Sequence, residues 1–595
     1  MKSERKAWKK AAKGNFKRHY LLFVAVCLAL AFLGAAYGHS LGALRAQIPG
    51  AETGNTGLLA AGSGVADVAK AMMENRLGHA GEQAREKEAQ YRRENKEGIF
   101  GRSRGVLAQF VNSVTSGNIL VIAAKTLLSL FHSPHIAALI LILASFLLAL
   151  FWWVFFRNIA AVVAARLFLE GRVYADVPLR RFFFLRDVRC WFRAARTMLF
   201  MVCLQVLWSL TVVGGVIKRY SYYLVPYIVA ENPKISAKEA VNLSRRMMDG
   251  HKWECFLLEL SFFGWGLLGV ATAGASEILF SNPYRSAALC EYYASLRGQA
   301  GEKRLEGAEW LNDTYLFEKA DARQLEEAYP EEEILEAIAK APTGLHGTRR
   351  FLAEAFGIAI TDSLEEQAWQ RSEEARLRAE RIRDEKEGTA YPTRLSALAE
   401  KERRGAFDPE GIHYIRHYSL LSLALMFFSF SAVGWIWEVS LHLISHGVFV
   451  NRGALLGPWL PIYGSGAVLI LILLNGLRGK PAQEFLGIVA LCGVVEYFTS
   501  FYLEKMRGGL RWWDYTGYLL NLNGRICAEG LLVFGMGGMA IVYLLAPRFD
   551  NLLRRIPKKI RVCLCILLVA LFAADVAYST VHPNMGAGIT SMKKY

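Results

Sequence analysis

Long apolar runs constrain this chain more than any other feature of its sequence. Between blocks of charged residues lie runs of about 18 or more apolar residues, the length that a helix needs to cross a hydrocarbon core of roughly 30 Å. A bilayer-crossing segment is expected to be helical, because its backbone polar groups must be satisfied within the segment. The chain of 595 residues is therefore predicted to be an all-α, polytopic membrane protein with soluble insertions.

The sequence predicts about eleven spans, of which 219–232 is a shorter run that continues 197–217 after a break. We expect spans near residues 20–38, 136–156, 197–217, 219–232, 253–273, 275–296, 416–440, 455–475, 484–503, 527–546 and 562–580. The predicted parts are a basic arm (1–19), a six-span module (20–297) with an extracytoplasmic block (39–117), a charged helical cytoplasmic segment (298–414) and a five-span module (415–595).

The formal net charge of +17 is explained by topology better than by nucleic-acid binding, since no recognition motif accompanies it. Lys and Arg lie beside the spans, where cytoplasmic basic residues fix orientation. The arm 1–19, the flank 157–196 and the loops 476–483 and 547–561 are all basic. We therefore expect a multi-pass membrane protein with a cytoplasmic N-terminus and an extracytoplasmic C-terminus. The first span is predicted to be an uncleaved anchor rather than a signal peptide, because the basic arm before it is long and no clean A-x-A site is visible.

Helix-breaking residues divide the middle of the first module. Gly214-Gly215 and Pro226 predict a broken hairpin. Ser236 and Glu239 then form a capping-box pattern, and Gly250 is a suitable helix stop. The basic helix between them is expected on the cytoplasmic surface, with an ordinary solvated connector as the alternative.

Catalytic and metal-binding motifs are absent from the sequence. Neither HExxH nor GxSxG occurs, and the nine cysteines lack the spacing of a zinc site. His442 and His446 share one helix face but have no third matched ligand. We expect no cofactor and no metal.

The segment RWWDYTGYLLNLNGRIC (511–527) is unusually rich in hydrogen-bonding groups for a loop between two apolar runs. The predicted topology places it at the extracytoplasmic membrane level together with Glu438, Arg452 and Glu504. Ionisable groups at this depth usually face a protein interior or a water-filled cavity. Two interpretations stay open: a cavity in which arginines bind a ligand or lipid headgroup, and an ion-pair network that holds the loops in place. In the first module, Glu259 and Glu277 suggest either a proton or cation path or helix-packing hydrogen bonds.

Two family resemblances cover most of the chain. Over most of 1–297, YSYYLVPYIVAENPKISAKEAVNLSRRMMDGHKW and LSFFGWGLLGVATAGASEILFSNPY resemble the bacterial integral-membrane family called domain of unknown function 975, which has no established activity. This resemblance implies that the protein lies in the plasma membrane of a bacterium. Over about 416–550, GWIWEVSLHLISHGVFVNRGALLGPWLPIYGSG and EYFTSFYLEKMRGGLRWWDYTGYLLNLNGRIC resemble the putative ABC-transporter type IV (CmpB-like) family. Ala528-Glu529 departs from that pattern by adding an acid.

The second resemblance implies a transporter permease and a set of matching polar positions. The candidate binding residues are Glu438, Asn451, Arg452, Tyr463, Glu496, Glu504, Trp513, Asp514, Tyr515, Asn521 and Arg525. No catalytic residues are assigned.

The sequence contains no GxxxxGK[ST] loop, so such a transporter would need a separate ATPase subunit. The first choice for function is thus a transporter-like permease or transport-accessory subunit in the lipid bilayer. One alternative is a membrane enzyme acting on lipid or cell-envelope intermediates, with Glu438, Glu504 and Asp514 in acid–base roles. Another is a non-transporting scaffold or sensor whose blocks 39–117 and 298–414 bind partners.

Overall fold

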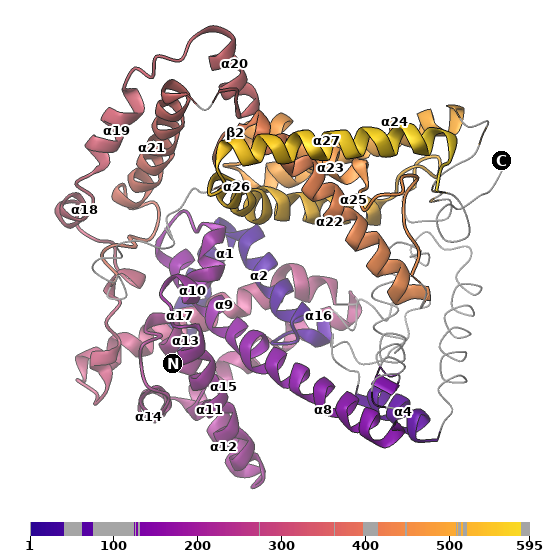
Figure 1. The fold of residues 1–595 in the computed structure, drawn as a ribbon. Coiled ribbons are helices and arrows are strands. Elements are labelled where there is room, and N and C mark those ends of the chain that lie inside the picture. Colours follow the sequence, from indigo (N-terminus) through magenta and orange to yellow (C-terminus); the bar gives the residue numbers. More distant parts are fainter. Residues whose placement is uncertain are drawn as a thin grey trace. The chain divides into compact units, whose positions relative to one another are not determined.

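The computed structural model describes residues 2–40, 62–74, 124, 127–128, 131, 133–272, 274–361, 363–396, 414–446, 449–506, 509, 513, 515 and 521–584. The chain divides into two compact units (Figure 1). Unit 1 comprises 1–69, 138–332 and 380–409, and unit 2 comprises 70–137, 333–379 and 410–595. The charged segment 298–414 thus contributes to both units, and the predicted four-part division stays a prediction.

Unit 1 is built almost entirely from helices. They are α1 (Lys2–Arg18), α2 (Tyr20–Phe32), most of α4 (Gly62–Met73) and α8 (Pro134–Trp152), η1 (Trp153–Arg157), α9 (Asn158–Val173), η2 (Leu179–Phe183), α10 (Phe184–Asp187), α11 (Trp191–Ser209), α12 (Val213–Ser221), α13 (Val225–Glu231), α14 (Ala237–Met247), α15 (Lys252–Leu260), α16 (Phe263–Ala271), η3 (Glu277–Ser281), α17 (Asn282–Glu302), η4 (Ala308–Trp310), η5 (Thr314–Leu316) and α18 (Ala322–Ala328). Helix α1 packs along α17, and α9 packs against α13.

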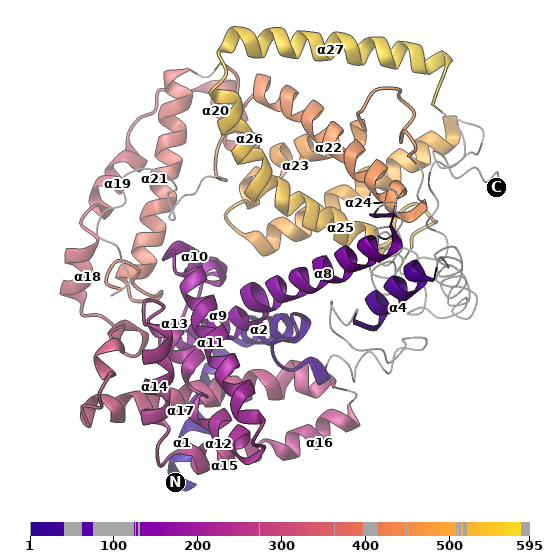
Figure 2. The same ribbon diagram turned by 60° about the horizontal axis from the view of Figure 1, so that its bottom comes forward.

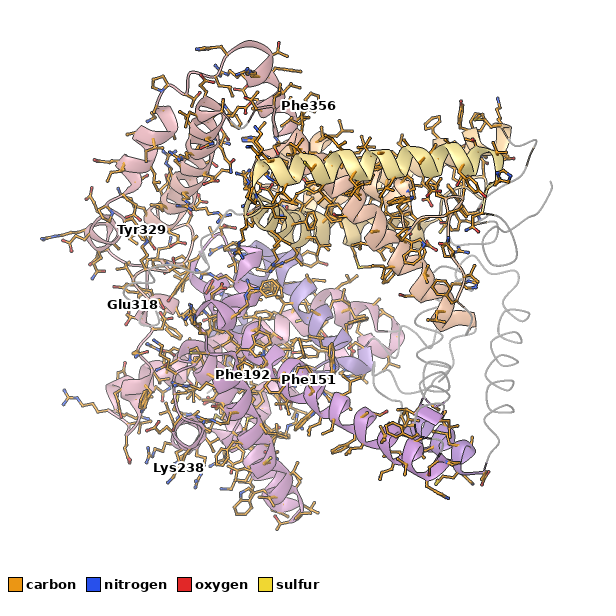
Figure 3. The ribbon with its side chains drawn as sticks, viewed as in Figure 1. Phe151, Phe192, Lys238, Glu318, Tyr329 and Phe356 are labelled. Atoms are coloured by element: carbon orange, nitrogen blue, oxygen red, sulfur yellow. The ribbon has the colours of Figure 1, made fainter. Side chains whose placement is uncertain are left out.

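Helices α8, η1 and α9 form one continuous apolar helix of 40 residues, whose first part is largely exposed and whose last part is buried. Phe151 of α8 and Phe192 of α11 are 52% and 75% exposed (Figure 3). Most residues of α9 are buried in unit 1. An apolar surface exposed on this scale suits a hydrocarbon environment, because a water-facing helix normally carries polar residues on its exposed side.

The predicted break in the middle of the first module is confirmed. Helix α11 ends at Ser209 and α12 begins at Val213, while Val212 adopts a φ of 39°. A Cβ on Gly215 would lie 2.8 Å from the Cα of Ser209, so the turn requires glycine at this close approach.

Helix α14 has the predicted start and stop. The Ser236 side chain accepts a hydrogen bond from the Glu239 amide, and the Glu239 side chain accepts one from the Ser236 amide. Gly250 follows the helix with a φ of 76°. The apolar face, which includes Leu243 and Met247, is buried in the core of unit 1.

Unit 2 combines a small charged subregion with the C-terminal helices (Figure 2). Its elements are α19 (Glu332–Lys340, from residue 333), α20 (Gly347–Phe356), β1 (Ile358–Ala359), the first part of α21 (Leu364–Lys386), β2 (Tyr418–Ser419), α22 (Leu420–His446), α23 (Pro461–Leu473), η6 (Asn475–Leu477), α24 (Pro481–Met506), α25 (Ala528–Ala540), η7 (Ile541–Leu545), α26 (Ala546–Arg554) and α27 (Lys558–Val581). β1 pairs in parallel with β2, so that Ile358 lies opposite Tyr418.

The C-terminal helices pack in pairs: α22 lies along α23, and α24 along α25. Gly464 of α23 meets the backbone of Phe427 and the side chain of Ser431, where any Cβ would overlap. Small residues permit such close helix contacts in membrane proteins. The core between these helices contains Met426 and Ile488, both fully buried.

Eleven spans are not confirmed. Among the described residues, six helices are long and apolar enough to cross a membrane, or up to eight if each bent pair is one span. The expected span at 219–232 is divided between α12 and α13, of 9 and 7 residues. The segment near 455–475 contains only the 13-residue α23. Helix α17 is long enough, but its 21 residues include two arginines and two glutamates.

Candidate polar site in the membrane module

One polar group forms around Glu438 near the end of α22. The Tyr463 hydroxyl donates to Oε1 of Glu438 at 2.7 Å, and Nη2 of Arg452 donates to Oε2 at 3.4 Å. Asn451 is fixed separately, because its Oδ1 accepts a hydrogen bond from the Trp435 indole at 2.6 Å. Glu438 and Arg452 are a little more than a quarter exposed. This pair is therefore accessible to solvent.

A second group forms between α24 and the segment that follows it. Nη2 of Arg525 donates to Oε2 of Glu504 at 2.8 Å, and the carbonyl of Arg525 accepts from the Trp513 indole at 3.1 Å. The Tyr515 hydroxyl donates to Oε1 of Glu496 at 3.0 Å. The Arg525 side chain is only 11% exposed. The pair of Arg525 and Glu504 is therefore more deeply buried than the pair of Arg452 and Glu438.

An Asn-Gly turn positions Arg525. Asn523 and Gly524 both have positive φ, 53° and 68°, and the Arg525 amide donates to the Leu522 carbonyl. These are the features of a type I′ turn, for which Asn-Gly is the preferred pair. Asn521 Oδ1 accepts from the Gly524 amide at 3.2 Å. The polar composition of this segment thus builds a tight turn, a role that the sequence interpretation missed although the Asn-Gly signal was present.

The structure therefore brings ten of the eleven predicted residues into local contacts, while Asp514 lies outside the described residues. The two groups are neighbours, because Tyr515 of the second group is close enough to Tyr463 of the first for the two phenols to interact. Burial raises the pKa of the Tyr515 phenol, and Glu496, Cys527 and Tyr463 raise it further. Both arginines are matched with a carboxylate. An anionic ligand would have to displace a glutamate from an arginine, whereas a neutral polar ligand would not.

Asp575 of α27 belongs to the same helical set and was not predicted. Its carboxylate accepts hydrogen bonds from the amides of Leu456 and Gly457, at 3.1 and 2.8 Å, and from the Trp459 indole at 2.7 Å. These residues line a shallow surface hollow of about 360 Å³. An aspartate inside an apolar run was the signal that could have found it.

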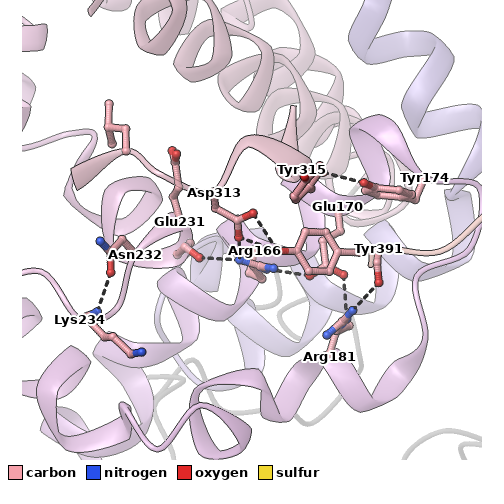
Figure 4. A network of polar contacts seen from close by, with 12 residues as sticks. Arg166, Glu170, Tyr174, Arg181, Glu231, Asn232, Lys234, Asp313, Tyr315 and Tyr391 are labelled. Atoms are coloured by element: carbon pink, nitrogen blue, oxygen red, sulfur yellow. Dashed lines mark hydrogen bonds and ion pairs between the residues drawn. The ribbon is translucent and has the colours of Figure 1, made fainter. Parts of the chain in front are cut away.

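Unit 1 contains a buried charge network of its own (Figure 4). Arg166 of α9 donates to Glu170 at 2.7 Å and to Asp313 at 3.0 Å. Arg181 pairs with the other oxygen of Glu170 at 3.0 Å, and the Tyr391 hydroxyl donates to Asp313. Asp313 and Tyr391 come from the charged segment 298–414, so this network joins that segment to α9.

The two acids considered for a proton path in the first module both have partners. Glu259 accepts from the hydroxyls of Tyr220 and Tyr223 and pairs with Arg285. Glu277 accepts from the Ser40 hydroxyl at 2.5 Å. These contacts fit the alternative of helix-packing hydrogen bonds.

The long apolar helices, with polar groups buried among them, define a helical integral membrane protein. Residues 425–580 match the family described as putative ABC-transporter type IV, and residues 110–300 match a family described as protein of unknown function (DUF975). Both predicted resemblances are thereby confirmed, and residues 425–580 are similar to a transporter family. No curated protein and no solved structure matches the chain. No group of three or more His, Cys, Asp or Glu side chains suited to a metal occurs in the described residues.

Proposed function

We propose that this chain is the membrane-embedded permease or transport-accessory subunit of a transporter whose ATP is hydrolysed by a separate subunit. One observation carries the proposal: the region matched to the ABC-transporter type IV family, 425–580, also contains buried polar groups among apolar helices. Ionisable groups in such a setting mark substrate and ion pathways in membrane proteins.

The polar cluster, defined as Glu438, Asn451, Arg452, Tyr463, Glu496, Glu504, Trp513, Asp514, Tyr515, Asn521 and Arg525, is the proposed binding region. Arg452 is its most accessible cation, and bidentate recognition of a phosphate or carboxylate is the chemistry that a guanidinium supplies best. In this proposal a substrate carboxylate or phosphate replaces Glu438 at Arg452.

The proposed site for the ATPase is helix α14. Its apolar face is buried, while Lys238 and Arg245 are exposed (Figure 3 labels Lys238). The charged segment 298–414 is the second candidate, and Arg323 is an exposed cation on its helix α18.

Affinity purification of the full-length chain from its own membranes in mild detergent, followed by mass spectrometry, tests this proposal. We expect an ATP-hydrolysing subunit to co-purify, and K238E/R245E to reduce its recovery at least several-fold while R323E leaves it unchanged. The reverse pattern would move docking to the charged segment. Recovery of no ATPase subunit, even after chemical cross-linking in membranes, would overturn the proposal.

The proposed orientation places the N-terminus in the cytoplasm and the C-terminus outside, in the plasma membrane of a bacterium, with the polar cluster near the outer surface. The basic loops 476–483 and 547–561 then lie inside, as cytoplasmic flanks should. A fluorescent protein that matures only in the cytoplasm should fluoresce when fused to the N-terminus and stay dark at the C-terminus. Fluorescence at both ends would contradict the proposed topology.

A further inference from the structure

Helix α24 carries three glutamates at different depths: Glu484, Glu496 and Glu504. At a rise of 1.5 Å per residue, Glu484 and Glu496 lie about 18 Å apart along the helix axis, and Glu504 lies about 12 Å further on. The three positions thus sample one end, the middle and the other end of a 26-residue apolar helix. A membrane helix rarely contains so many acids without a functional reason.

The three glutamates differ in how their charge is compensated. Glu504 has a guanidinium partner, because Arg525 donates to it at 2.8 Å. Glu484 is 0% exposed and Glu496 5% exposed, and neither forms an ion pair within the part of the chain that the structure describes. Both carboxylate oxygens of Glu484, and Oε2 of Glu496, accept no hydrogen bond there.

Among the described residues, the buried cation near Glu484 is Arg478, but its guanidinium binds backbone carbonyls instead. Arg478 donates its Nη1 and Nη2 hydrogens to the carbonyls of Arg416 and Leu471. Burial lowers the pKa of the Arg478 guanidinium, and the nearby Tyr418 and Glu484 oppose that shift. Lys480 is exposed. The Tyr543 phenol of η7 also faces Glu484, and its hydroxyl donates to the Arg478 carbonyl.

Among the residues that the structure describes, no lysine or arginine pairs with Glu496. Its facing ionisable groups are the phenols of Tyr515 and Tyr463 and the thiol of Cys492. Helix α25, which packs along α24, has the sequence AEGLLVFGMGGMA and offers neither lysine nor arginine. Only the Tyr515 hydroxyl donates a hydrogen bond to this carboxyl group among the described residues.

The free-energy cost of burial decides whether the carboxyl groups of Glu484 and Glu496 are ionised or protonated. A buried carboxylate without a partner costs several kcal/mol even after relaxation, whereas a neutral polar group without a hydrogen bond costs roughly 1–3 kcal/mol. A group in this position therefore takes up a proton rather than stay ionised. We propose that Glu484 and Glu496 are proton-binding sites of α24, occupied in this conformation and placed at two depths of the same membrane helix. This inference goes beyond the proposed function and does not depend on an ATPase.

Infrared spectroscopy of the purified full-length chain at neutral pH tests the proposal, since a protonated carboxyl group absorbs apart from a carboxylate. We expect E484Q and E496Q each to remove part of the carboxylic-acid absorption, and the double variant to remove both parts. E504Q is the matched control on the same helix and should leave this absorption unchanged. Retention of the full wild-type signal in E484Q/E496Q would overturn the proposal.

Thermal unfolding supplies a second readout. Glutamine has nearly the shape and charge of a protonated glutamate, so E484Q and E496Q should each change Tm by no more than about 2 °C. E504Q leaves Arg525 buried without its charge partner and should lower Tm clearly more. Losses in E484Q and E496Q as large as in E504Q, or failure of both variants to fold, would mean that these side chains are ionised and would overturn the proposal.

Discussion

At the scale of single residues, Asp575 of α27 binds a segment that lies far earlier in the chain. Its carboxylate accepts four hydrogen bonds, three of them from the segment 456–459 that lies more than 115 residues earlier in the chain. Hydrogen bonds to a charged group contribute more than neutral ones. We expect D575N to lower the free energy of unfolding by about 2 kcal/mol. The NH2 group of asparagine cannot accept a hydrogen bond, so at least one of the N–H groups that Asp575 now binds would lose its acceptor.

Thermal or denaturant unfolding of the full-length chain measures this change, and S579A is its control. Ser579 donates only one of the four hydrogen bonds, at 3.0 Å, so S579A should cost less than half as much. Equal losses in both variants would show that the segment is held by its apolar contacts instead.

Arg525 and Glu504 form a buried ion pair whose contribution to stability can be measured. The two side chains are 11% and 19% exposed, and Arg525 also lies over the rings of Tyr497 and Phe501. Removing one member of a buried pair leaves an uncompensated charge, so R525Q should cost about 3 kcal/mol of unfolding free energy.

A double-mutant cycle separates this pair from its surroundings. R525Q/E504Q should cost clearly less than the sum of the single variants, since neither charge is then left without a partner. Additive losses would mean that Arg525 acts through its aromatic and backbone contacts rather than through Glu504.

At the scale of elements, the buried network of unit 1 holds part of the charged segment against α9. Asp313 is 1% exposed and receives hydrogen bonds from Arg166 and Tyr391. D313N should therefore lower stability by about 3 kcal/mol and expose residues 303–332 to protease. Limited proteolysis with mapped cleavage sites measures the exposure. E318Q is the matched control, because Glu318 is an exposed acid of the same segment (Figure 3), and it should be cut like the wild type.

Elements that depend on local chemistry were predictable. The start of α14 at Ser236 and the interruption near Gly214 follow from capping and glycine geometry within a few residues, and both were predicted. The number of spans was not predictable, because the apolar character of 219–232 does not reveal that two short helices divide it. Packing against neighbouring helices, rather than composition, decides where such a run breaks.

For the candidate site, the sequence identified residue types and left their partners open. The pairing of Arg525 with Glu504 crosses 21 residues, and that of Arg166 with Asp313 crosses 147. Such long-range pairs depend on how helices pack, which periodicity does not encode. Topology did place Glu438 and Arg452, and likewise Glu504 and Arg525, at common levels, and each of these pairs is in contact.

At the scale of the whole molecule, stability should depend on pH through His417. This residue is 7% exposed, with its ring 4.3 Å from that of Trp369. Burial, reinforced by Arg478 and Arg554 and opposed by Glu366, lowers the pKa of His417 to about 3. The unfolded chain protonates this imidazole below about pH 6.5, but the folded chain does not. Stability should therefore fall as pH decreases from about 6.5 toward 3, by up to about 1.4 kcal/mol per pH unit from this group.

The variant H417F isolates this contribution, since phenylalanine keeps a ring beside Trp369 and cannot take up a proton. Denaturant unfolding between pH 7 and pH 4 should give a shallower loss of stability for H417F than for the wild type, because the unfolded state no longer gains a proton at this position. H582F is the matched control: His582 also lies against an aromatic ring, that of Tyr578, but is exposed. H582F should lose stability with decreasing pH as steeply as the wild type. An equally steep loss in H417F would show that groups other than His417 cause the acid sensitivity.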